Sequence, residues 1–130
     1  MSEPTTKAIE DEVARVIREM GENVVVKKRF MPPEPDRCVL VTARARYKPV
    51  DRSGDAIRTF ALQVRVRDPK LAIDLADKID VHLTLYPWAA HPSPIDSLTW
   101  ESTGDIGRDA NDRDEIAYNY EVIANVTRIH

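Results

Sequence analysis

Residues that commonly carry catalysis or bind metals are few in this chain and stand far apart. None of its three histidines, His82, His91 and His130, has the short spacing that places two imidazoles on one metal ion. No GxSxG elbow, phosphate-binding glycine loop or HExxH motif occurs. A catalytic site needs several convergent groups. The chain is therefore predicted not to be an enzyme and to use no cofactor or metal.

The single cysteine points the same way. Cys38 stands in the apolar run RCVLV, so we expect a small buried hydrophobe. One cysteine excludes an internal disulfide and a multi-cysteine zinc site. No segment has the pattern of a signal peptide or a membrane span, and we expect a protein that works in a reducing, aqueous place.

An acidic cluster between residues 105 and 115 is the one group that could hold a hard cation. Its members do not have the alternating offsets of a calcium loop. Arg108 and Arg113 are interleaved with them, which favours a self-neutralised surface loop over a metal site. The carboxylates are those of Asp105, Asp109, Asp112, Asp114 and Glu115.

Arginines form a more informative pattern. Arg44 and Arg46 lie on one predicted strand and Arg65 and Arg67 on the next, each alternating with apolar residues. If these strands pair, the four arginines share a face, and like charges on neighbouring strands cost stability. Acidic groups of the same chain or water would relieve them in one interpretation. In the other, a neighbouring subunit or a polyanion meets this face, a role that suits the planar, weakly hydrated guanidinium.

These side chains must be positioned by elements that the apolar periodicity predicts. In TTKAIEDEVARVIREMG, apolar residues recur at spacings of three and four, which predicts a helix capped by Thr5 or Thr6 and ended at Gly21. A second helix is predicted to start with Asp68 as its N-cap and Pro69 as its first residue, and to stop at Pro87. Strands are predicted over 23–30, 37–47, 59–67, 95–102 and 116–129. Between them we expect a stiff proline loop at 31–36, a polar loop at 48–58 and a charged excursion at 103–115.

This order of elements predicts a single α+β domain over residues 1–130. We expect one layer of mostly antiparallel sheet, with about five or six strands, both helices on one face, and the order α-β-β-β-α-β-β(-β). The edges of this sheet are not protected by proline or by short length. One core is expected to contain Ile9, Val13, Val16, Leu62, Val64, Val66, Leu75, Ile79, Val122 and Val126.

Composition bounds the possible partners. The chain has 130 residues, 42% of them hydrophobic and 32% charged, as in an ordinary globular domain. Its formal net charge of −3 argues against a protein that grips nucleic acid over its whole surface. A small nucleic-acid-binding module that uses only the arginine-lined sheet face remains the alternative from another class. The predicted outward positions of these strands carry no aromatic residues on which bases could stack.

Two stretches resemble the tail terminator and minor capsid proteins of tailed bacteriophages. The first, LQVRVRDPKLAIDLADKI, is a strand followed by a helix with an Asp-Pro start. The second, GRDANDRDEIAYNYEV, has a charged turn before a last strand with an Asn-Tyr pair. Where such proteins usually have a glycine in this turn, the chain has Asp112. The residues that carry this second likeness are Gly107, Arg108, Asp109, Arg113, Asn119 and Tyr120.

The resemblance implies a structural virion protein. Tail terminators cap the growing tail tube as a hexameric ring, end its elongation and form part of the head–tail junction. The implied partners are further copies of the chain, the tail tube protein and a head-completion or connector protein, and DNA passes through the ring without sequence-specific binding. The implied location is the virion, after assembly in the host cytoplasm, with no membrane contact.

The loop at 48–58 is the predicted contact to the tail tube, because loops positioned by a rigid scaffold commonly carry binding. Its charged residues would supply complementarity and its two apolar residues the anchors; a solvent loop without a partner is the alternative. The candidate interface residues are Arg44, Arg46, Arg65, Arg67, Val50, Asp51, Arg52, Asp55, Ile57, Arg58, Arg108 and Arg113.

Overall fold

A computed structural model describes residues 5–46, 58–90 and 92–124 of the chain. Helix α1 spans Thr6–Arg18 and follows the predicted N-cap, since the Thr5 hydroxyl accepts a hydrogen bond from the Ala8 N–H at 3.1 Å. Gly21 has a φ of 74°, the left-handed conformation that suits glycine just after a helix. The amino-terminal helix is therefore confirmed at both ends.

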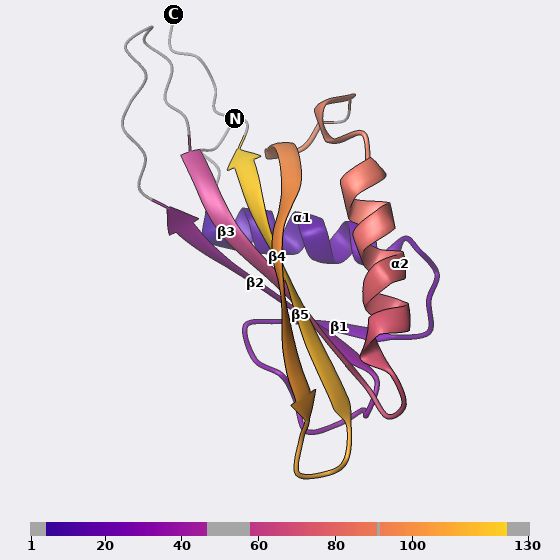
Figure 1. Cartoon of the computed structure of the whole chain (residues 1–130). Helices are drawn as coiled ribbons and strands as arrows, with labels where there is room; N and C mark the ends of the chain where they lie inside the picture. Colours follow the sequence, from indigo (N-terminus) through magenta and orange to yellow (C-terminus); the bar gives the residue numbers. More distant parts are fainter. Residues whose placement is uncertain (1–4, 47–57, 91, 125–130) are drawn as a thin grey trace, which may run out of the picture.

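Five strands form one open sheet in the order β1-β2-β3-β5-β4 (Figure 1). β1 runs parallel to β2, and every other neighbouring pair is antiparallel. The predicted α+β class and element order are thus confirmed. The sheet is mixed, with parallel and antiparallel pairs, because β1 runs parallel to its neighbour. The strands span Val25–Lys28 (β1), Cys38–Arg46 (β2), Arg58–Asp68 (β3), Ile95–Arg108 (β4) and Asp114–Ala124 (β5).

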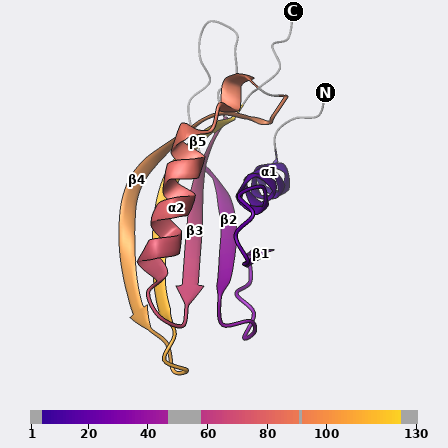
Figure 2. The same ribbon diagram turned by 90° about the vertical axis from the view of Figure 1, so that its right-hand side faces the viewer.

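Both helices cover the same face of this sheet, as predicted. Figure 2 shows α1 beside β1 and β2 and helix α2, Ala72–Leu85, over the other strands, with a short 3₁₀ turn at Trp88–Ala90 after it. The alternating apolar side chains of the strands pack beneath them in one cluster. Val126, the tenth predicted core residue, lies outside the described residues, and the other nine are all buried: Ile9, Val13, Val16, Leu62, Val64, Val66, Leu75, Ile79 and Val122.

The predicted start of the second helix is wrong. Asp68 stays in β3, where it is paired with Asp114, and its carboxylate binds the Lys70 N–H at 2.8 Å and Arg37 at 3.2 Å. The helix begins at Ala72, whose N–H donates to the Asp114 carboxylate at 2.8 Å. Sheet pairing therefore keeps Asp68 extended, and a carboxylate more than forty residues away in sequence satisfies the helix start instead.

The predicted charged excursion at 103–115 is also mostly strand. β4 continues past residue 102 to Arg108 through Gly104 and Gly107, and only the turn before β5 is irregular. Three register shifts along the β4–β5 ladder absorb residues that a regular strand would not accommodate, one of them between Asp105 and Gly107. Pairing with β5 keeps β4 extended through two glycines that, in the sequence, indicate a turn.

Candidate functional site

The sheet face opposite the helices carries the arginines that the sequence placed together. Strand register sets Arg44 and Arg46 of β2 on the same side as Arg65 and Arg67 of β3, as predicted. We call this surface the open face. The structure also shows which groups meet the arginines, and most of them belong to the chain itself.

Arg46 forms the centre of a charge cluster at the β2–β5–β4 end of the open face. Its two terminal nitrogens bind both carboxylate oxygens of Glu101, at 2.7 and 3.0 Å, and one of them also binds Glu121 at 3.2 Å. This two-pronged geometry is the strong form of the arginine–carboxylate pair, and it raises the pKa of Arg46. Arg65 is also paired with a glutamate, through a single hydrogen bond from its Nε to Glu115 of β5 at 2.7 Å.

Arg67 is buried, with 3% of its surface exposed. It donates to the carbonyl oxygens of Asp36 and Pro35, at 3.1 and 2.5 Å. The proline loop between β1 and β2 therefore crosses the open face and covers its end. Groups of the same chain therefore neutralise or bind Arg46, Arg65 and Arg67, as in the first interpretation. Arg44 is exposed.

Arg113 ties the β4–β5 turn to the same proline loop. Its Nε binds Asp109 at 2.9 Å and one terminal nitrogen binds the Pro33 carbonyl oxygen at 2.5 Å. Hydrogen bonds from the backbone N–H groups of Arg113 and Asn111 and from the Arg113 side chain hold the pKa of Asp109 below its usual range. For Asp109, this is the neutralisation by an interleaved arginine that the sequence predicts, with the Arg113 side chain only 8% exposed.

Two further residues complete the turn. Asp112 has a φ of 60°, at the position where the resemblance calls for glycine; aspartate is among the few side chains that adopt this conformation without a large cost. Arg108 donates to the Asp112 carbonyl oxygen at 2.7 Å and to the Lys70 carbonyl oxygen at 3.0 Å. The turn is thereby fixed to the segment that precedes α2.

A row of uncharged polar side chains crosses the middle of the open face. Gln63 donates to Asn119 at 3.1 Å, and Asn119 donates to Ser102 at 3.2 Å, which links β3, β5 and β4. With Thr42 and the Arg46 cluster, this row lines a hollow of about 340 Å³. Sequence reasoning missed the row, because its members are neighbours only through strand register.

The predicted tube-contacting loop falls almost wholly outside the described residues. Val50, Asp51, Arg52, Asp55 and Ile57 belong to that segment. Arg58 is the first residue of β3, and its guanidinium lies 5.4 Å from the centre of the Phe60 ring, a cation–π distance.

The two edges of the sheet differ. β1 has four residues, and its Val26 and Lys28 carbonyl oxygens accept hydrogen bonds from the Arg18 side chain and the Phe30 N–H, each at 2.9 Å. The expectation that neither edge is protected by short length is therefore wrong for β1. β4 has 14 residues and leaves one side of its backbone unpaired by any described strand.

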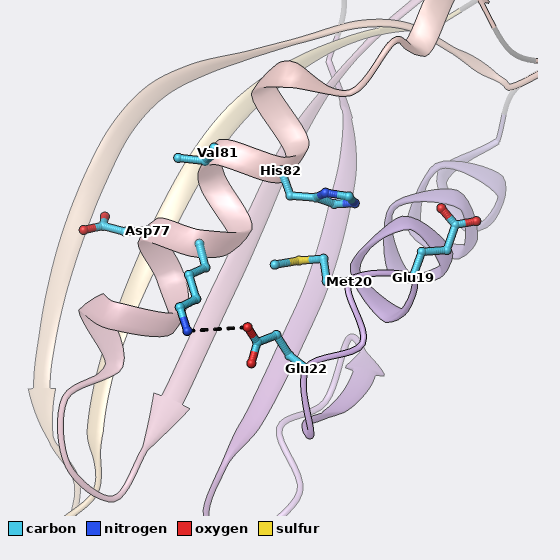
Figure 3. A pocket seen from close by; sticks show the side chains of 7 residues that line it. Glu19, Met20, Glu22, Asp77, Val81 and His82 are labelled. Carbon is cyan, nitrogen blue, oxygen red and sulfur yellow. Dashed lines mark ion pairs between the residues drawn. The ribbon is translucent and has the colours of Figure 1, made fainter.

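A pocket lies between the end of α1 and α2 (Figure 3). It has a volume of about 680 Å³, and its rim carries the ion pair Lys78–Glu22 at 3.5 Å. The His82 Nε2 lies 3.2 Å from the Val16 carbonyl oxygen, so this ring nitrogen is already engaged. Nowhere in residues 5–46, 58–90 and 92–124 do three or more metal-ligating side chains gather, and no helix there is long and apolar enough to cross a membrane.

Fold and surfaces together define a small α+β domain whose polar groups are largely engaged with one another. A family model for the bacteriophage tail terminator protein matches residues 20–126, which include all five strands and α2. The chain belongs to this family, a family of structural phage tail proteins, and is a virion component. No curated protein sequence matches it.

Proposed function

We propose that this chain caps the phage tail tube as a hexameric ring, ends tail elongation and forms part of the head–tail junction. Its partners are further copies of itself, the tail tube protein and a head-completion or connector protein. The observation that carries the proposal is the family match over residues 20–126. The mechanism is assembly by complementary shape and charge, without a bond made or broken.

The charge arrangement of the open face supports a ring through which DNA slides. A surface that neutralises many phosphates binds DNA strongly and in a salt-dependent way. Here Arg46 and Arg65 are paired with glutamates and Arg67 is held by backbone carbonyl oxygens. Few unpaired arginines are therefore left for DNA on the described strands of the open face, which also weakens the alternative of a nucleic-acid-binding module.

The loop around Val50–Ile57 is the proposed contact to the tail tube. It joins β2 and β3, two strands of the rigid layer, and contains both charged and apolar residues. Asp51, Arg52, Asp55 and Arg58 would supply charge complementarity to the tube.

Negative-stain electron microscopy of tails made with and without this chain tests the function. With the chain removed from the phage, tails of uncontrolled length that do not join heads are expected. Tails of normal length that join heads would overturn the proposal. Fluorescence anisotropy with a labelled 20-base-pair duplex tests the alternative: tight, salt-sensitive binding by the free chain would favour the nucleic-acid module.

A further inference from the structure

The two margins of the sheet carry opposite charge. At the β4 margin, exposed or half-exposed carboxylates of β4 and of the neighbouring side of α2 gather; we call this the acidic margin. At the other edge, in β1 and the two residues after it, three of the six residues from Val25 to Phe30 are cationic; we call this segment the basic corner. The acidic margin consists of Asp77, Asp80, Asp96, Glu101 and Asp105, and the basic corner carries Lys27, Lys28 and Arg29.

Both surfaces also expose large apolar side chains. At the acidic margin, Ile73, Trp100 and Ile106 are 44%, 48% and 45% exposed. At the basic corner, Phe30 is 73% exposed and Val25 is 37% exposed. Exposed hydrophobic residues that lie singly need no explanation, but an aromatic side chain beside unpaired charge has the composition of a protein–protein contact.

Some charges of each surface are already neutralised within the chain, among them Glu101, which is paired with Arg46. Lys28 is paired with Asp11, and Arg29 with Glu10 at 3.2 Å. Lys27 forms no ion pair within the described part of the chain, and neither do Asp96 and Asp105 of β4. Each surface thus retains charge that a partner of opposite sign would satisfy.

We propose that the basic corner of one copy docks on the acidic margin of the next, with Phe30 seated against the apolar side chains of β4. This inference rests on the proposed function, since it assigns the subunit contact of the ring. A contact between two different surfaces of one chain is heterologous, and such contacts repeat head to tail until they close. A symmetric contact of either surface with itself would place like charges against one another, which opposes association.

The positions of the two surfaces also favour a contact that repeats from one copy to the next. β1 and β4 are the first and last strands of the sheet order, so the two surfaces lie on opposite sides of the molecule (Figure 2). Two β1 carbonyl oxygens already accept hydrogen bonds, which disfavours addition of a strand there, whereas one side of the 14-residue β4 is paired with no described strand. The contact is therefore one of side chains against the β4 margin, and covering β4 removes the edge that a lone subunit exposes.

Disulfide cross-linking between copies tests the contact. The double variant Phe30→Cys/Ile106→Cys should give a ladder of covalent multimers under mild oxidation, in assembled tails and in the concentrated free chain. Each single variant should give none, and a mixture of the two single variants should give dimers only. The native Cys38 is fully buried and does not interfere. Dimers of a single variant with itself, or no ladder in tails that carry the chain, would overturn the inference.

A charge swap keeps the test decisive if the cysteine variants do not assemble. Lys27→Glu and Asp105→Lys should each weaken self-association, measured by sedimentation velocity, and their combination should restore it. Unchanged association in both single variants, or no recovery in the double variant, would refute the contact. A ring seen at the tail end without these effects leaves the proposed function standing, whereas absence of the chain from tail ends refutes that function itself.

Discussion

Removal of one hydroxyl group, in Tyr120→Phe, should loosen α2 from the sheet. The Tyr120 ring is fully buried, and its hydroxyl donates to Asp80 of α2 at 2.7 Å. A hydrogen bond to a charged group contributes about 1.5–3 kcal/mol. Because Asp80 is half-exposed and gains water when the donor is lost, we expect the lower end, about 1.5 kcal/mol, or a fall in Tm of about 5 °C. The ring still fills its place in the core, so no cavity contributes.

The same substitution should change the alkaline stability profile. Burial, helped by the Asp80 carboxylate, raises the pKa of Tyr120 above its usual value, and burial with Asp77 does the same for Tyr118. Above pH ~10 the unfolded chain releases both phenolic protons while the folded chain retains them. Stability therefore falls as pH rises, by up to about 1.4 kcal/mol per pH unit for each tyrosine. Tyr120→Phe should halve this contribution.

Urea unfolding at pH 7 and at several values from pH 9 to 11 measures both effects. Asp74→Asn, at an exposed α2 carboxylate with no tyrosine partner, is the matched control and should change stability by less than about 0.5 kcal/mol. If Tyr120→Phe has the midpoint of the wild type at pH 7 and the same alkaline slope, the hydroxyl does not hold the helix to the sheet.

Three further outcomes are expected. Leu75→Ala should cost about 2–5 kcal/mol in urea unfolding, because Leu75 is 2% exposed in the core beneath α2; Ile73→Ala, on the exposed side of the helix, should stay near the wild type, and equal effects would mean that α2 is not docked as described. Glu10→Gln should cost about 1 kcal/mol, since the buried Glu10 carboxylate accepts the Ala43 N–H at 2.8 Å and pairs with Arg29; an unchanged midpoint would contradict this. Deletion of residues 51–56 should leave the domain folded but give abnormally long tails or tails that do not join heads, and normal tails would make the loop a mere connection.

Apolar periodicity correctly predicted the elements that are determined by residues close together in the sequence. The stripe of Ile9, Val13 and Val16 fixes α1, and alternation in β2 and β3 fixes which side chains face the core. In these segments the apolar pattern and the cap residues agree with the final packing, so nothing non-local opposes them.

The errors arose where distant strands decide the structure. Asp68 has the chemistry of an N-cap, yet pairing with Asp114 keeps it in β3. Gly104 and Gly107 have the chemistry of a turn, yet the β5 ladder carries β4 through them. Likewise, the alternation showed that Arg46 and Arg65 share a face, but the glutamates that meet them come from β4 and β5, 50 to 75 residues away. Spacing in the sequence contains no information on that register.

The place of β3 at the centre of the sheet has a consequence for how the domain opens. Its backbone is paired with β2 on one side over nine residues and with β5 on the other side over 11 residues. Among the described strands, β4 is paired on one side only. Amide hydrogen exchange should therefore be slowest in β3 and fastest along the outer amides of β4. A subunit can thus fray at β4 while its central strands stay intact, and protection gained by β4 amides would report the moment at which a neighbour covers them.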